Sequence, residues 1–186
     1  MSSYRVAVTG GAATGKSTVC GYIQDLGFEV LSLDDVGHEV LEQAQTRTKI
    51  SEALGLGEDW TRDDLRSAVL KSSGARRQLN AITHPIILKR MNESSVHFVE
   101  VPLLVETCIQ HYFQEIWLVD CGKVEQLRRL TVRLNSVAKA RQFVASQLPI
   151  ESKYFFADLI VRTNEPESNV QRYVSERIES IRDLIL

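Results

Sequence analysis

One stretch near the start of the chain has the residue types and the spacing needed to bind phosphate. It matches the pattern G-x-x-x-x-G-K-[ST] at every fixed position, which are Gly10, Gly15, Lys16 and Ser17. Glycines let the backbone bring its N–H groups close to phosphate oxygens, a lysine reaches the β- and γ-phosphates of a nucleotide, and a serine hydroxyl holds Mg²⁺. The candidate nucleotide-binding residues here are Gly10, Gly11, Ala12, Ala13, Thr14, Gly15, Lys16, Ser17 and Thr18.

The flanking residues predict a strand before this loop and a helix after it. Tyr4–Thr9 is a short apolar run rich in residues that favour strands. Val19, Ile23 and Leu26 then recur at helical spacing, and Gly27 can end the helix. The positive end of that helix dipole favours an anion. A glycine turn with a surface lysine is the alternative, but the complete match in this context favours nucleotide binding.

A carboxylate, Asp34, follows the second apolar run of the chain, 28–31. Phosphoryl transfer needs a group that orients the attacking hydroxyl and accepts its proton, and a carboxylate can also hold a metal-bound water. We therefore predict that Asp34 is catalytic and lies near the metal. The alternative role is the N-cap of a helix over Asp35–Ala44, and the two roles are compatible.

Two arginines and an asparagine are further candidates for contacts with the nucleotide. Arg133 and Arg141 flank a short polar segment, which we expect to act as a small cover whose guanidinium groups neutralise the transferred phosphoryl. We assign Arg133 to catalysis and Arg141 to ATP binding. Asn164 follows the last apolar run, where its amide can read the adenine edge; a turn before Pro166 is the alternative.

An alternation of strands and helices must position these residues. Helical patterns separate five apolar runs, at 4–9, 28–31, 97–101, 115–120 and 158–162. Such alternation predicts an α/β fold with a parallel sheet, whose ligands bind at the carboxyl ends of the strands. We expect one domain with a core of 1–33, 96–132 and 148–186, a helical insertion of 34–95 and a lid of 133–147.

Local signals predict where several helices begin and end. Thr61 and Asp64 have the spacing of a capping box, and Ser168–Gln171 has the same pattern before the last helix. A helix that begins near Gly74 is expected to be interrupted at Pro85, because proline lacks the N–H that helices need.

The composition is that of an ordinary globular protein. The 186 residues are 44% apolar and 25% charged with a net charge of −2, which predicts neither disorder nor a nucleic-acid partner. No apolar run approaches a membrane span and the N-terminus lacks a signal peptide, so we expect a cytoplasmic protein without a membrane partner. Cys20, Cys108 and Cys121 are expected to be buried or half-buried free thiols. The oligomeric state stays open.

Beyond the loop, motifs along nearly the whole chain resemble those of the dephospho-coenzyme A kinase family. Gln126, Arg129 and Arg133 are similar to its Q-x-x-R-x-x-x-R helix. The other matching segments are Val8-Thr9-Gly10-Gly11, Leu26-Gly27-Phe28-Glu29-Val30, Leu79-Asn80-Ala81-Ile82-Thr83-His84-Pro85, Val101-Pro102-Leu103-Leu104-Val105-Glu106, and the tail residues Gln147, Lys153, Ala157, Asp158 and Asn164.

This resemblance implies both a fold and a reaction. The family transfers a phosphoryl group from ATP, bound with Mg²⁺, to the ribose 3′-hydroxyl of dephospho-CoA. Its fold is a P-loop kinase with a parallel five-stranded sheet flanked by helices, a helical acceptor-binding insertion and a small lid. His84 and Glu106 are then expected to bind the acceptor, Ser17 and Asp34 to hold the metal, and Lys16 to act in catalysis with Asp34 and Arg133.

Three departures from the family pattern leave two alternatives open. The family usually has D-x-D and then an arginine after the second strand, where this chain has Ser32, Asp34 and His38, and Glu100 stands where an aspartate is common. One alternative is a P-loop kinase for another small acceptor, a nucleotide or nucleoside, although the match at 79–85 argues against it. The other is a nucleotide-binding protein without turnover, which the missing acid and the replaced arginine favour slightly.

Overall fold

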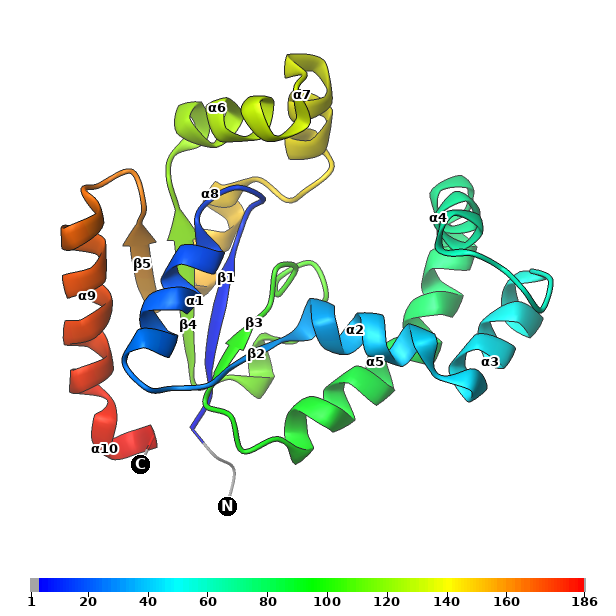
Figure 1. Ribbon diagram of the computed structural model, residues 1–186, viewed down its shortest axis with the longest axis horizontal. Helices are drawn as coiled ribbons and strands as arrows, with labels where there is room; N and C mark the ends of the chain where they lie inside the picture. The colour runs from blue at the N-terminus through cyan, green and yellow to red at the C-terminus, as the bar shows by residue number, and fades with distance from the viewer. Residues whose placement is uncertain (1–3, 186) are drawn as a thin grey trace. The chain divides into compact units, whose positions relative to one another are not determined.

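The structure, a computed structural model, describes residues 4–185 and is built on a five-stranded parallel sheet (Figure 1). The strands lie in the order β2-β3-β1-β4-β5, and every neighbouring pair is parallel. Their bounds are β1 (Val6–Gly10), β2 (Val30–Ser32), β3 (Phe98–Glu100), β4 (Glu115–Asp120) and β5 (Leu159–Arg162). The predicted parallel sheet is confirmed; β4 has its predicted bounds, and the other strands differ from prediction by a residue or two.

The chain divides into two compact units. The sheet unit ends at Ser32 and resumes at Val96, and the helical unit is Leu33–Ser95. Beside the strands, the sheet unit contains α1 (Lys16–Asp25), α6 (Lys123–Leu134), α7 (Val137–Ala145), α8 (Ile150–Lys153), α9 (Glu167–Ser180), α10 (Arg182–Ile185) and short 3₁₀ turns at Gln110–Tyr112 and Tyr154–Phe156. The helical unit contains α2 (Leu33–Glu42), α3 (Ala44–Leu54), α4 (Arg62–Lys71) and α5 (Ser73–Glu93). None of these helices is long and apolar enough to cross a membrane.

The core of the sheet unit fixes the strand that leads into the phosphate-binding loop. Every residue of β1 is buried, as expected for the central strand. Helices α1 and α9 pack against each other, and their apolar residues join the same cluster as Val8 and Trp117. The rings of Phe98 on β3 and Trp117 on β4 meet edge to face at 5.6 Å, on the two strands that flank β1. The start of the loop is therefore held in a well-packed frame.

Within the helical unit, α5 differs from the prediction of a break at Pro85. The helix runs without interruption from Ser73 to Glu93 and includes the proline. Pro85 removes one backbone hydrogen bond, but α5 packs against α2, α3 and α4, and these tertiary contacts keep the helix continuous. The prediction of an interruption was wrong because the free energy lost at one proline is smaller than the free energy gained by packing the long helix.

The two predicted capping boxes had different outcomes. Thr61 caps α4 as predicted: its hydroxyl accepts from the Asp64 N–H at 3.2 Å, and the Asp64 carboxylate accepts from the Thr61 N–H at 2.8 Å. The box at Ser168–Gln171 was wrong, since α9 begins at Glu167 and Pro166 is its N-cap without a side-chain bond. Pro166 has the non-helical conformation of an N-cap residue, with φ −54° and ψ 140°, so the helix begins before the serine.

Two glycines at opposite ends of the loop-to-helix region predict opposite effects on stability. A Cβ on Gly10 would lie 2.3 Å from the Val119 carbonyl oxygen, whereas a Cβ on Gly21, inside α1, would meet nothing within 4 Å. We expect Gly10→Ala to lower the free energy of unfolding by about 2–3 kcal/mol through overpacking. Gly21→Ala, its control, is expected to raise that free energy by about 0.5–1 kcal/mol, because alanine is the better helix former. Urea unfolding measures both, and equal shifts would contradict the packing at Gly10.

Candidate functional site

The phosphate-binding loop connects the end of β1 directly to the start of α1. Ala13 (φ 59°) and Gly15 (φ 96°) have left-handed backbone conformations, and α1 begins at Lys16. The first turn of α1 carries no acidic residue, so no side chain there neutralises the positive end of the helix dipole. Ser17 and Thr18 are exposed at this helix end. The segment therefore has the features of an anion-binding helix N-terminus.

Lys16 folds back over the loop that precedes it. Its ammonium donates to the carbonyl oxygens of Gly10 at 3.2 Å and Gly11 at 3.0 Å. These bonds hold a positive charge beside the loop. The arrangement fits the predicted contact between Lys16 and nucleotide phosphates.

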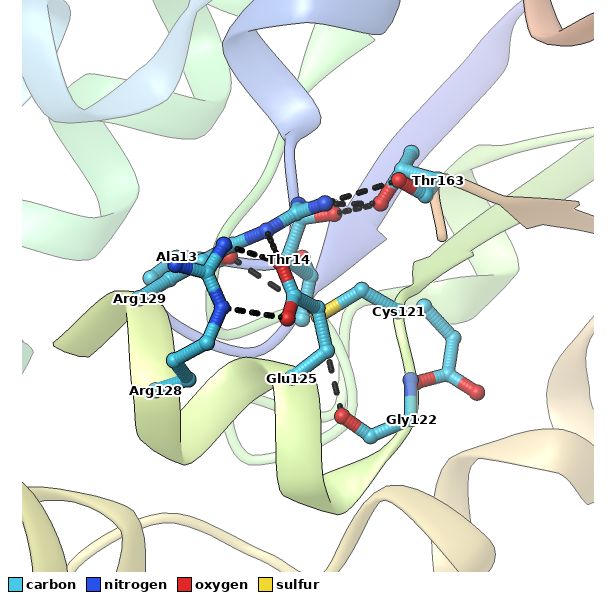
Figure 2. A network of polar contacts seen from close by, with 9 residues as sticks. Ala13, Thr14, Cys121, Gly122, Glu125, Arg128, Arg129 and Thr163 are labelled. Carbon is cyan, nitrogen blue, oxygen red and sulfur yellow. Dashed lines mark hydrogen bonds and ion pairs between the residues drawn. The ribbon is translucent and has the colours of Figure 1, made fainter. Parts of the chain in front are cut away.

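The far side of the loop is braced by the end of β5 and by α6 (Figure 2). The Thr163 hydroxyl donates to the Thr14 carbonyl oxygen, and the Arg129 guanidinium donates to the Thr163 carbonyl oxygen at 2.8 Å. A Cβ on Gly15 would lie only 3.1 Å from the Thr163 side chain, so the glycine allows this close approach. Sequence reasoning assigned no role to Thr163 or Arg129, although Arg129 belongs to the Q-x-x-R-x-x-x-R motif.

Arg129 is itself held by a carboxylate on its own helix. Glu125 accepts from Arg129 Nε at 2.7 Å and from Nε and Nη2 of Arg128, each at 2.7 Å. Hydrogen bonds from Arg128 and then Arg129 lower the pKa of Glu125 to about 2. Glu125 thus stays ionised at any physiological pH and orients Arg129 toward Thr163 (Figure 2).

A hollow of about 600 Å³ opens beside this braced side of the loop. Arg129, Thr163 and Asn164 line it, together with residues 121–125 at the start of α6. Asn164 is exposed at this hollow. The contact between Asn164 and adenine stays a prediction.

A second cavity, of about 470 Å³, lies on the α7 side of the loop. Gly11 and Arg141 both line it, so the structure brings Arg141 to the same cavity as the phosphate-binding loop. Gln126 and Gln147 line it as well, and sequence reasoning gave neither a role at the site. Arg133 lies exposed in the last turn of α6 and lines neither cavity, so its contact with phosphate stays a prediction.

Glu106, a predicted acceptor ligand, pairs with a buried lysine of the same unit. Its carboxylate lies 2.6 Å from the ammonium of Lys153, whose side chain is only 1% exposed. Both carboxylate oxygens are shielded from solvent. Removing one partner of such a pair leaves an uncompensated buried charge, so Glu106 anchors the segment after β3 to α8. Its contact with the acceptor stays a prediction.

In the helical unit, Asp34 and His84 lie on different helices. Asp34 is the second residue of α2 and is exposed. Its alternative role as N-cap was wrong, because α2 begins at Leu33 directly after β2, without an intervening turn. His84 lies half-buried within α5, and burial lowers its pKa below the ordinary 6.5. Its imidazole is therefore neutral at pH 7 and can act as a hydrogen-bonding group.

The three cysteines are free thiols, and two of them lie close to the loop in sequence or space. Burial raises the pKa of Cys20 to about 12 and raises that of Cys121, so neither is a nucleophile near neutral pH. Cys121 packs under the loop, with its sulfur 3.9 Å from the Ala13 carbonyl oxygen (Figure 2). Cys108 is exposed, contrary to prediction, because it lies in a turn outside the strands.

Comparisons with known proteins agree with this geometry. A family model described as dephospho-CoA kinase matches residues 4–169. The dephospho-CoA kinase of Shouchella clausii is 30% identical over 94% of this chain and 96% of its own length, and that of Dehalococcoides mccartyi is 30% identical over 94% and 98%.

Solved structures show the same fold. The protein TT1252 from Thermus thermophilus superposes with a TM-score of 0.83 at 22% identity, covering 97% of this chain and 99% of its own. The dephospho-CoA kinase of Campylobacter jejuni gives a TM-score of 0.68 at 25% identity, covering 95% and 96%. With a matching family model over most of its length and these full-length relatives, the chain belongs to the dephospho-CoA kinase family.

Proposed function

We propose that this protein transfers the γ-phosphoryl group of ATP to the ribose 3′-hydroxyl of dephospho-CoA, which gives coenzyme A. The observation that carries the proposal is the phosphate-binding loop, with Lys16 bonded across it and α1 starting at its end, in a chain of this family. The backbone N–H groups and Lys16 bind the phosphates of the donor and stabilise the charge of the transition state. Arg141 and Arg133 add positive charge from the α6–α7 pair.

The residues of the loop also fit a magnesium ion carried by the nucleotide. Ser17 presents an exposed hydroxyl at the end of the loop, and Glu100 is the last residue of β3, the strand next to β1. Among residues 4–185 no group of three acidic, histidine or cysteine side chains could hold a metal by itself. The ion would therefore be held mainly by phosphate oxygens and water, with Ser17 as a protein ligand and Asp34 as the second proposed metal-binding residue. When bound, it neutralises charge on the phosphates.

The acceptor is proposed to bind to the helical unit. His84, half-buried and neutral on α5, offers a hydrogen bond to it. Asp34, on the first turn of α2, orients the attacking hydroxyl and takes its proton. The proposed location is the cytoplasm, since the free thiols of Cys20, Cys108 and Cys121 are typical of a reducing compartment.

An acceptor panel tests this function directly. The purified full chain is supplied with ATP and Mg²⁺ and with dephospho-CoA, an adenosine nucleotide, a nucleoside or no acceptor. ADP release and the mass of the product are then measured. We expect a product heavier by one phosphoryl group with dephospho-CoA alone. Phosphorylation of a nucleotide or nucleoside instead would support another acceptor, and ATP binding without any product would support a binding protein without turnover.

His84→Ala is expected to raise the KM for dephospho-CoA about threefold to tenfold while the KM for ATP stays nearly unchanged, because one hydrogen bond to the acceptor is lost. Steady-state kinetics with each substrate varied in turn measure the two values. His111→Ala, an exposed histidine outside the helical unit, is the matched control. A loss that is equal for both substrates would instead indicate a folding defect in α5.

A further inference from the structure

The peptide groups of one loop residue, Ala12, are held by two glutamine side chains. The Ala12 N–H donates to Gln147 Oε1 at 3.1 Å, and the Ala12 carbonyl oxygen accepts from Gln126 Nε2 at 3.0 Å. An N–H can only donate and a carbonyl can only accept, so the chemistry of the backbone fixes the orientation of both amides. Gln126 is buried, with only 7% of its surface exposed, and Gln147 is half-buried.

The two glutamines come from the two ends of one helical hairpin. Gln126 lies in the first turns of α6, and Gln147 lies just after the end of α7. Helices α6 and α7 pack against each other and are joined by a short turn at Asn135 and Ser136. Both ends of the hairpin are therefore hydrogen-bonded to the same residue of the phosphate-binding loop, Ala12.

The loop is shaped to accept this contact. A Cβ on Gly11 would lie 2.4 Å from Gln126 Nε2, so the amide fills the space that a side chain would need. Ala12 also precedes Ala13, whose backbone is left-handed. The planes of these two peptides determine where the following N–H groups point, because each peptide is rigid and only φ and ψ can turn it.

We propose that Gln126 and Gln147 are positioning residues that fix the Ala12 peptide for phosphate binding and tie the α6–α7 hairpin to the loop. Neither side chain needs to touch the nucleotide. The proposal rests on ATP as the donor in the proposed function. It assigns to the hairpin a role in shaping the phosphate-binding loop, in addition to carrying Arg133 and Arg141.

The same substitution at both positions gives a matched test. Gln126→Glu and Gln147→Glu each add one negative charge near Ala12. Glu at 147 keeps an oxygen that accepts from the Ala12 N–H, whereas Glu at 126 turns a carboxylate oxygen toward the Ala12 carbonyl oxygen. We expect Gln126→Glu to raise the Kd for ATP at least about tenfold, and Gln147→Glu to raise it by about threefold or less.

The pH dependence of ATP binding by Gln126→Glu is a readout that a purely structural role of Gln126 would not change. A protonated Glu at 126 can donate to the Ala12 carbonyl oxygen again, so ATP affinity of Gln126→Glu is expected to improve relative to wild type between about pH 8 and about pH 5.5. The KM for dephospho-CoA is expected to stay unchanged in both variants. Gln142→Glu, an exposed glutamine on α7, is the control and should bind ATP as wild type does.

Calorimetric ATP binding without acceptor separates this proposal from the proposed function. If wild type binds ATP but phosphorylates no dephospho-CoA, the comparison of variants still stands. Thermal unfolding checks that each variant is folded, and Gln126→Met, which removes the donor without adding charge, should weaken ATP binding about threefold to tenfold. The proposal is overturned if Gln126→Glu and Gln147→Glu weaken binding equally, which would indicate a charge effect, or if folded Gln126→Met binds ATP like wild type.

Discussion

Asp34→Asn is expected to lower kcat for dephospho-CoA phosphorylation by about 10²- to 10⁴-fold, the usual contribution of a general base. The side chain keeps its size and its hydrogen-bonding oxygen but can no longer take the proton of the attacking hydroxyl. Ser32, at the end of β2, cannot replace it, because a hydroxyl is not a base near neutral pH. Since Asp34 does not belong to the phosphate-binding loop, the Kd for ATP should stay close to that of wild type.

The adjacent carboxylate provides the control for this prediction. Asp35 also lies exposed in the first turn of α2, so Asp35→Asn removes the same charge from the same helix end. Each change weakens α2 by about 0.3–1 kcal/mol through the helix dipole, which is too little to explain a large loss of kcat. Initial rates at saturating substrates, measured for Asp34→Asn, Asp35→Asn and wild type, test this prediction. Equal activity of Asp34→Asn and wild type, or equal losses in the two variants, would remove the catalytic role of Asp34.

Lys16→Ala is expected to lower kcat/KM for ATP by about a hundredfold, because it removes a fixed positive charge from the developing charge on the phosphates. The bonds from its ammonium to Gly10 and Gly11 also disappear, so the loop loses part of its support. Lys16→Met keeps most of the aliphatic chain, and we expect it to lower kcat/KM by about the same factor. Equal losses in the two variants would assign the effect to the charge of the ammonium.

Two measurements keep this second prediction specific. Lys49→Ala, an exposed lysine on α3, is the control and should leave kcat/KM unchanged. Urea unfolding should show that the Lys16 variants remain folded. ATP turnover near the wild-type rate in Lys16→Met would contradict the assignment of this lysine to the phosphates.

The sequence predicted those parts of the fold that depend on neighbouring residues. The capping box of Thr61 is satisfied within one helical turn, so its signal is local and was confirmed. Pro85 is a local signal too, but α5 continues through it because three other helices pack against α5. A pattern in the sequence does not show how much tertiary packing will oppose it.

Only the part of the candidate site that is contiguous in the sequence could be predicted. The phosphate-binding loop and the helix that follows it are contiguous, and their residue types identify them. The bracing of the loop is not contiguous: Thr163 is 149 positions from Thr14, and Gln147 is 135 positions from Ala12. Only the folded sheet brings these partners together, so no spacing rule could have paired them.

The contact between Gly11 and Gln126 also limits the order in which the two positions can change during evolution. While glutamine occupies position 126, its amide fills the place of a Cβ at position 11, so alanine at that position meets a clash. A shorter residue at 126 would first open the space, but it would also release the Ala12 carbonyl oxygen from its donor. Both changes act on the same hydrogen bond between Gln126 and Ala12, so we expect their effects on the free energy of unfolding to be non-additive.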